Sequence, residues 1–143
     1  MQDNQIFELK EKLVPLFKED KRIVAVYLFG SSASGLTHKR SDIDLAILFD
    51  PKEKFNIDDL LGLEVRITLV LKTERFDLIV ANSASLVLKF RVISTGKLLY
   101  NACDDLRADF EERVMQEYYD FLPRLNEFNR DYFSTLKENY LHD

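Results

Sequence analysis

The sequence has little of several residue types and patterns, and each scarcity excludes a class of protein. Its single cysteine, Cys103, cannot form a disulfide within the chain, which fits a reducing compartment. No apolar run approaches the roughly 18 residues of a membrane span. The first residues lack the basic and apolar segments of a signal peptide, so we expect a cytoplasmic protein. Basic residues are not in excess: 20 Lys and Arg face 25 Asp and Glu, which argues against direct nucleic-acid binding.

What the sequence does contain is the composition of one globular domain. It has 143 residues, of which 46% are hydrophobic and 31% charged, so it can bury a core without disulfides or metals. Charge and aromatic residues are unevenly spread. Residues 104–143 carry 5 basic and 11 acidic residues and 8 of the 17 aromatics. This final stretch therefore differs in kind from the rest of the chain.

Hydrophobic periodicity predicts an α/β fold, in which a small mixed sheet is backed by helices. Continuous apolar or β-branched runs predict strands over 23–29, 43–49, 76–80 and 97–100. Helical spacing predicts helices over 4–19 and 85–95, the second ending at Gly96. From residue 104 or 105 onward the pattern predicts one long helix or a helix pair, with a break at Pro123.

Residues 56–72 fit two patterns. Asn56 is a suitable N-cap for a helix, and apolar residues at 60, 63, 67 and 71 would share one helix face. The apolar residues at 65, 67, 69 and 71 also alternate as they would in a strand. The length of the run favours a helix, and the strand remains the alternative.

One segment combines residues suited to phosphate chemistry. A strand ends at Gly30-Ser31, and after a polar spacer Asp42-Ile43-Asp44 opens the next strand. Residues i and i+2 of a strand share a face, so the two carboxylates would lie side by side and favour a divalent cation. Glycine permits close backbone approach, and the serine offers a hydroxyl and an N–H to a phosphate oxygen. This is the equipment of phosphoryl or nucleotidyl transfer.

Each part of this pattern is weak alone. An Asp-x-Asp pair usually marks only a solvated strand end, and a lone Gly-Ser turn means less. The ordered combination is more specific, because carboxylates at the mouths of apolar strands are costly unless paired or metal-bound. Asp77, the second residue of the strand at 76–80, would add a third carboxylate if that strand lies beside the one at 43–49.

The pattern Gly30-Ser31…Asp42-Ile43-Asp44 resembles the DNA polymerase β-type nucleotidyltransferase superfamily. The wider strings at 28–46, 75–81 and 96–100, with the aromatic helical tail, resemble the minimal nucleotidyltransferase (MNT) antitoxins of HEPN/MNT toxin–antitoxin systems. The resemblance implies a polymerase β-like fold. Residues 1–103 would form the nucleotidyltransferase core, and 104–143 an acidic, aromatic-rich helical extension of the same domain.

The resemblance also implies an activity and a partner. MNT antitoxins of this kind transfer AMP from ATP to a tyrosine of a HEPN-family RNase toxin. By this resemblance we expect the same activity here and a hetero-oligomer with the toxin. We expect no membrane partner. The catalytic and metal-binding roles, toward two Mg²⁺ ions, would fall on three carboxylates: Asp42, Asp44 and Asp77. The nucleotide-binding roles would fall on Gly30, Ser31 and Arg40. Arg40 could equally be an ordinary surface residue of the polar spacer.

Two other functions compete with this interpretation. A small-molecule nucleotidyltransferase of the aminoglycoside-modifying kind would resemble it in motif, but such enzymes carry an added domain for the acceptor. A non-catalytic antitoxin that only masks its toxin would have little reason to keep three carboxylates.

The acidic, aromatic tail suits a basic RNase surface. The plainer interpretation is a helix packed on its own domain with its acidic side chains in solvent.

Overall fold

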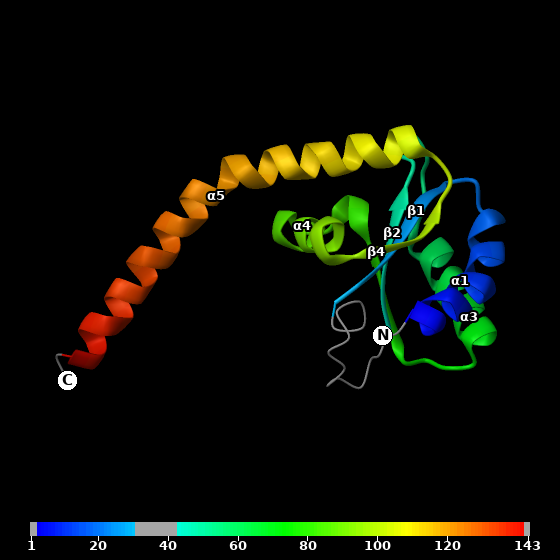
Figure 1. Ribbon diagram of the computed structural model, residues 1–143, viewed down its shortest axis with the longest axis horizontal. Coiled ribbons are helices and arrows are strands. Elements are labelled where there is room, and N and C mark those ends of the chain that lie inside the picture. Colours follow the sequence, from blue (N-terminus) through cyan, green and yellow to red (C-terminus); the bar gives the residue numbers. More distant parts are fainter. Residues whose placement is uncertain (1–2, 31–42, 142–143) are drawn as a thin grey trace.

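The computed structural model describes residues 3–30 and 43–141, and it confirms the predicted α/β architecture (Figure 1). Within these residues no helix is both long and apolar enough to cross a bilayer. In chain order the elements are α1 (Asp3–Lys18), β1 (Ile23–Phe29), β2 (Ile43–Phe49), α3 (Ile57–Leu71), β3 (Phe76–Val80), the 3₁₀ turn η1 (Ala81–Ser83), α4 (Leu86–Thr95), β4 (Lys97–Asn101) and α5 (Asp104–Leu141).

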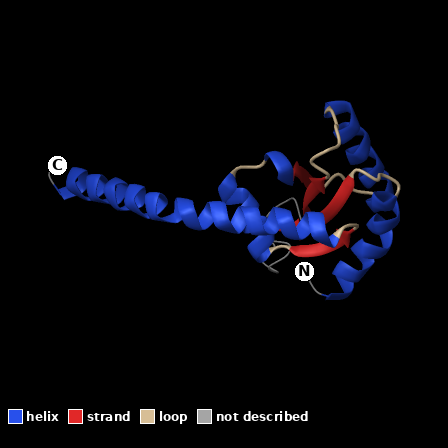
Figure 2. Cartoon of the chain, turned by 90° about the horizontal axis from the view of Figure 1, so that it is seen from above, coloured by secondary structure: helices blue, strands red, loops and turns tan. Residues whose placement is uncertain are grey.

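The four strands form a mixed sheet in the order β3-β2-β1-β4. β1 is antiparallel to both of its neighbours, whereas β2 and β3 are parallel and α3 connects them. α1 and α3 cover one face of the sheet, while α4 and the first half of α5 cover the other (Figures 1 and 2). β1 is buried along its whole length because it lies inside the sheet with helices on both sides.

The segment with two possible patterns is a helix, so the strand alternative is wrong. Asn56 caps α3 as predicted: its side chain accepts a hydrogen bond from the backbone N–H of Asp59, and the Asp59 carboxylate accepts one from the Asn56 N–H. This reciprocal capping box satisfies two backbone donors at the start of the helix. Local hydrogen bonding therefore decided between helix and strand.

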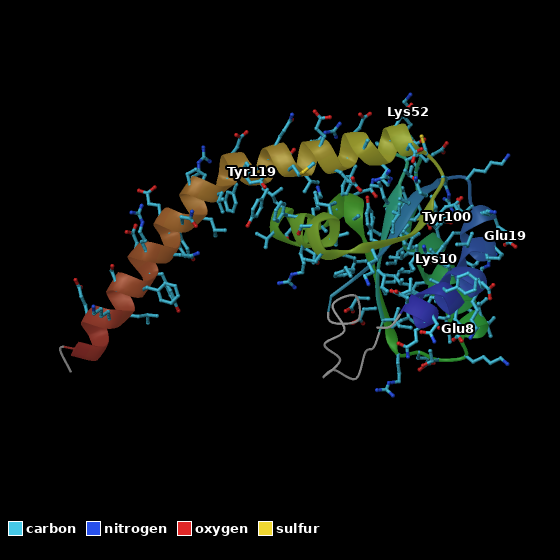
Figure 3. All side chains as sticks on the ribbon, viewed as in Figure 1. Glu8, Lys10, Glu19, Lys52, Tyr100 and Tyr119 are labelled. Carbon is cyan, nitrogen blue, oxygen red and sulfur yellow. The ribbon has the colours of Figure 1, made fainter. Side chains whose placement is uncertain are left out.

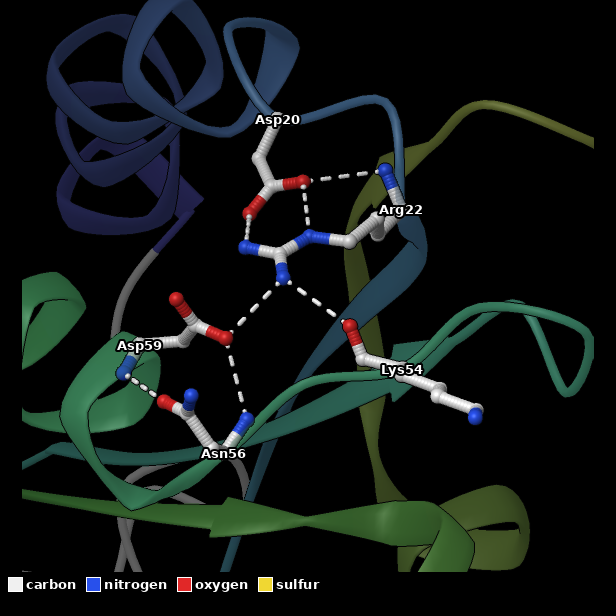
Figure 4. A network of polar contacts seen from close by, with 5 residues as sticks. All are labelled: Asp20, Arg22, Lys54, Asn56 and Asp59. Atoms are coloured by element: carbon white, nitrogen blue, oxygen red, sulfur yellow. Dashed lines mark hydrogen bonds and ion pairs between the residues drawn. The ribbon is translucent and has the colours of Figure 1, made fainter.

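Arg22 ties the start of α3 to the turn between α1 and β1 (Figure 4). Its guanidinium binds the Asp20 carboxylate at 2.8 Å, and it donates at 3.1 Å to both the Asp59 carboxylate and the Lys54 carbonyl. The hydrogen bonds from Arg22 hold the pKa of Asp20 below its usual value. The network fixes where α3 begins, and with it the connection from β2 to β3.

The predicted break at Pro123 is wrong, because α5 continues through it as one helix. Proline removes one backbone hydrogen bond and usually bends a helix rather than ending it when both flanks are strongly helical. The helix axis does change direction near Tyr119 (Figure 3).

Gly96 follows α4 as predicted, but its φ of −74° is not left-handed. It is glycine because a Cβ there would overlap the carbonyl oxygen of Val92.

The first half of α5 is anchored on the sheet. The Tyr27 hydroxyl of β1 donates to the Glu111 carboxylate at 2.7 Å, and Arg107 donates to the same oxygen at 3.0 Å. Further along, Tyr118 stacks on Phe90 of α4 with ring centroids 3.7 Å apart. Beyond this contact α5 leaves the body of the molecule and projects from it (Figure 1).

Candidate active site

The candidate active site begins with two aspartates on neighbouring strands. β2 and β3 are parallel, and their register places Asp44 directly opposite Asp77. Residues two positions further on, Ala46 and Ile79, pack in the core on the α4 side of the sheet. Because alternate residues share a face, both carboxylates project toward that same side. Asp44 is half-buried and Asp77 is exposed. β3 thus lies beside β2, which is the condition on which Asp77 was included in the predicted site.

Gly30 lies against Asp44 at the end of β1. Phe29, the last residue of β1, is the register partner of Asp44, so the chain leaves the sheet next to that carboxylate. Gly30 has a φ of +78°, a left-handed conformation that glycine adopts without strain. A Cβ on Gly30 would overlap Oδ2 of Asp44 and would lie 3.3 Å from the Asp44 Cγ. Glycine is thus needed for both the backbone conformation and the position of the carboxylate.

These residues lie along an open groove of about 850 Å³ beside the edge strand β3. From the sheet and α4 the described lining residues are Phe29, Asp44, Phe76, Asp77, Leu78, Ile79 and Leu88; from α3 and the turn after it they are Glu64, Val65, Thr68, Leu69 and Glu74. The groove is therefore walled by the sheet edge on one side and by α3 on the other.

The described lining of the groove is electronegative: four of its residues are acidic and none is basic. Asp44 and Asp77 are neighbours on adjacent strands, so their charges repel, and a divalent cation with a preference for oxygen ligands relieves the repulsion. Within residues 3–30 and 43–141, no three metal-ligating side chains gather at one point. The described part of the chain thus supplies a pair of carboxylates, and a complete metal site requires a third oxygen donor from elsewhere.

Of the six predicted site residues, the structure brings three together: Gly30, Asp44 and Asp77. The other three, Ser31, Arg40 and Asp42, lie outside the described residues. Sequence reasoning missed the α3 wall of the groove, which includes Glu64 and Thr68. The available signal was the excess of apolar residues in 56–72, which left too many for one buried face.

A second cavity of about 410 Å³ lies at the opposite end of β2, beneath α5. Its lining includes Phe49, Phe55, Phe110 and the basic side chains of Lys89 and Arg113. None of Gly30, Asp44 and Asp77 lines it. We therefore place the candidate active site at the groove beside β3.

Comparison with known proteins defines the class. Residues 11–105 match the model of the polymerase beta nucleotidyltransferase family, which is more than half of the chain. The chain belongs to this family.

Individual relatives narrow the comparison. The chain is 30% identical over 129 residues to the protein adenylyltransferase MntA of Aphanizomenon flos-aquae, covering 80% of this chain and 83% of the relative. It is also 30% identical over 106 residues to the protein adenylyltransferase MntA of Shewanella oneidensis, covering 73% and 69%.

Solved structures agree with these relatives. A crystal structure of a toxin–antitoxin with AMP-PNP contains a chain that is 26% identical and superposes with a TM-score of 0.70, covering 87% of this chain and 98% of the other. A complex of tri-AMPylated Shewanella oneidensis HEPN toxin with MNT antitoxin gives a TM-score of 0.68 at 23% identity, covering 90% and 98%. The second likeness concerns the fold alone. The polymerase β-like fold predicted from the sequence is confirmed.

Proposed function

We propose that this protein is the antitoxin of a HEPN/MNT pair and an adenylyltransferase that neutralises its toxin by transferring AMP from ATP to a toxin tyrosine. The observation that carries the proposal is the pairing of Asp44 with Asp77 on adjacent strands, with Gly30 packed against Asp44. The chain that holds these residues is 30% identical to protein adenylyltransferases. Such an antitoxin would act in the cytoplasm, where the RNA substrates of its toxin are found.

The carboxylates fit a magnesium-dependent reaction. Oxygen ligands are those that Mg²⁺ prefers, and we assign Asp42, Asp44 and Asp77 as the ligands of two ions. When bound, the ions neutralise the triphosphate and stabilise charge on the oxygens around the α-phosphorus. We assign the positioning of the triphosphate to Gly30 and Ser31. The positive-φ turn at Gly30 leaves space beside Asp44 that a side chain would fill.

The proposed reaction is a substitution at phosphorus. The acceptor tyrosine oxygen forms a bond to the α-phosphorus of ATP, the bond between that phosphorus and the α–β bridging oxygen breaks, and pyrophosphate leaves. A free tyrosine hydroxyl has a pKa of about 10, so its proton must be taken up as the bond forms. Asp77 is exposed on the groove and can accept that proton.

We further propose that residues 1–103 form the catalytic core and 104–143 an extension of the same domain that contributes to toxin binding. In support, the family match ends at residue 105, while the first half of α5 packs on β1 and α4. The second half carries exposed aromatic side chains: Phe128 is 65% exposed and Phe133 64%. Exposed aromatics of this size favour a protein interface.

The test is intact mass spectrometry of the cognate HEPN-family protein after incubation with this protein, ATP and Mg²⁺. The proposal expects a mass increase of one or more adenylyl groups on tyrosine, absent when ATP is replaced by AMP. An unmodified partner that nevertheless loses RNase activity on complex formation would favour steric masking. Modification of aminoglycosides but not of the partner would favour the small-molecule alternative.

A further inference from the structure

The outward side of α3 carries four aliphatic side chains at four-residue intervals. Ile57 is 67% exposed, Leu61 50%, Val65 58% and Leu69 71%. Residues four apart lie one above the other on a helix, so the four form a continuous strip, which we call the α3 strip. The core-facing side of α3 is supplied by other residues, Leu63 and Ile67.

This arrangement is unusual for a helix at the surface of a domain. Such a helix normally has one apolar face toward the core and a polar face toward solvent. Single exposed apolar residues need no explanation, but a contiguous strip marks an interaction site. The α3 strip is not required for folding, because α3 already buries its other face and its start is fixed by the capping box and by Arg22.

The strip runs directly into the candidate active site. Val65 and Leu69 line the groove that also contains Asp44 and Asp77, whereas Ile57 and Leu61 continue outside it toward the start of the helix. Whatever covers the strip therefore lies against the reaction site at one end. An acceptor tyrosine must enter this groove, and the protein that carries it must contact the surface around the groove.

We propose that the α3 strip is the docking surface for the acceptor protein, which lays an apolar segment along α3 and so places its tyrosine in the groove. This inference rests on the proposed function and names the surface by which that function selects its substrate. Binding energy from contacts outside the groove would offset the loss of freedom needed to orient one tyrosine. Glu64 and Glu74 at the groove favour basic residues beside that tyrosine.

The experiment uses the full chain with Ile57 and Leu61 replaced together, Ile57→Gln and Leu61→Gln. Neither residue lines the groove, and glutamine is a good helix former, so fold and nucleotide site should persist. Association with the unmodified cognate HEPN-family protein, measured without ATP, should weaken at least tenfold. AMP transfer should slow equally at low acceptor concentration and recover at saturating acceptor. The affinity for AMP-PNP should be unchanged.

The matched control is Phe7→Gln, which removes a side chain of similar exposure (60%) from α1. It should leave association and transfer at wild-type values. Circular dichroism and thermal unfolding of each variant check that the fold is intact.

Three outcomes would overturn the docking inference. The first is wild-type association by the double variant while AMP transfer proceeds, which leaves the proposed function standing. The second is a loss of AMP-PNP affinity, which would make the strip part of the nucleotide site. The third is a wild-type dimer that becomes monomeric in the double variant by light scattering, which would assign the strip to self-association. Failure of the proposed function is distinct: wild-type protein would bind the partner without transferring AMP.

Discussion

At the scale of single residues, Asp44 and Asp77 offer the most direct test of the site. Asp44→Asn and Asp77→Asn each remove one negative charge with little change in volume. We expect AMP transfer to the partner to fall at least a hundredfold in each, since loss of one electrostatic contact to a transition state typically costs that much. The measurement is the initial rate of transfer by intact mass at saturating ATP and Mg²⁺.

The control for these variants is Glu8→Gln, which neutralises an exposed carboxylate on α1 that does not line the groove. Its transfer rate should equal that of the wild type. Thermal unfolding of both aspartate variants should stay near the wild-type temperature, or rise, because two like charges are no longer held side by side. Transfer at the normal rate by Asp44→Asn would remove Asp44 from the catalytic assignment.

Two glycines of this chain should respond oppositely to the same substitution. Gly30→Ala adds a methyl that overlaps the Asp44 carboxylate, at a φ of +78°, so it should displace that carboxylate and reduce AMP transfer at least tenfold. Gly62→Ala is the matched control. Gly62 lies inside α3, and beyond the backbone of its own helix and its chain neighbours no atom lies within 4 Å of the added Cβ, so the substitution should stabilise the protein by up to about 1 kcal/mol. Urea unfolding and transfer rates measure the two effects, and unimpaired transfer by Gly30→Ala would contradict the close packing.

At the scale of elements, periodicity predicted the four strands and three of the four α-helices of the described residues, favoured a helix for the fourth, and did not predict the 3₁₀ turn η1. The segment containing α3 remained ambiguous because apolar residues lie on both its faces, Leu63 and Ile67 inward and Val65 and Leu69 outward. Periodicity alone cannot distinguish such a helix from a buried strand. Pro123 was predicted to break α5, yet strongly helical flanks carry the helix through it. The helix at α3 and the continuation of α5 through Pro123 both depend on flanking residues, and a hydrophobic pattern does not take these into account.

The hydrogen bond that anchors α5 on β1 predicts a pH-dependent stability. Tyr27 is 3% exposed and donates to Glu111, so Tyr27→Phe should lower the free energy of unfolding by about 1–3 kcal/mol at pH 8. Burial and the Glu111 carboxylate raise the pKa of Tyr27 above its usual value near 10. The unfolded chain therefore loses this proton first, and the contribution is present below pH 10 and lost as the pH rises further.

Urea unfolding at pH 8 and at pH 10.5 measures this effect. The stability difference between wild type and Tyr27→Phe should be smaller at the higher pH. Tyr119→Phe serves as the control. Tyr119 lies on α5, the helix that Tyr27 anchors, but it is 61% exposed, so stability should change little at either pH. A difference that stays constant with pH would show that the Tyr27 hydroxyl does not titrate as its environment dictates.

At the scale of the whole molecule, the sequence could name candidate site residues but could not show that they lie together. Gly30 and Asp44 were proposed from their spacing along the chain. Asp77 could be included only on the condition that its strand lies beside β2, and the parallel β2–β3 register that meets this condition is a long-range feature. The groove beside these residues depends on how α3 packs after the sheet has formed. The strand register and the groove both arise from tertiary packing. From a single sequence, the site could therefore be predicted only on the condition that these strands pair.

The whole-molecule view also divides the acidic tail into two parts. Residues 104–120, which include the half of α5 that is anchored on the sheet, contain seven acidic and two basic residues, whereas 121–143 contain four acidic and three basic. The excess negative charge therefore lies beside the body of the molecule, and the projecting half is nearly neutral and aromatic. Steering of a basic partner should depend on the first part and contact area on the second.

Charge reversal in the first part tests this division. Asp109, Glu112 and Glu117 are exposed on α5, and replacing all three by lysine should slow association with the cognate HEPN-family toxin about tenfold or more at low salt. Because salt screens exposed charges, the effect should shrink as ionic strength rises to 0.5 M. Thermal stability and AMP-PNP binding should change little. The matched control reverses Glu127, Asp131 and Glu138 in the projecting half, and it should slow association less. Stopped-flow mixing at several salt concentrations measures the association rates of both variants. If the variant at Asp109, Glu112 and Glu117 associates as fast as the wild type at low ionic strength, these three carboxylates are only a solvated surface.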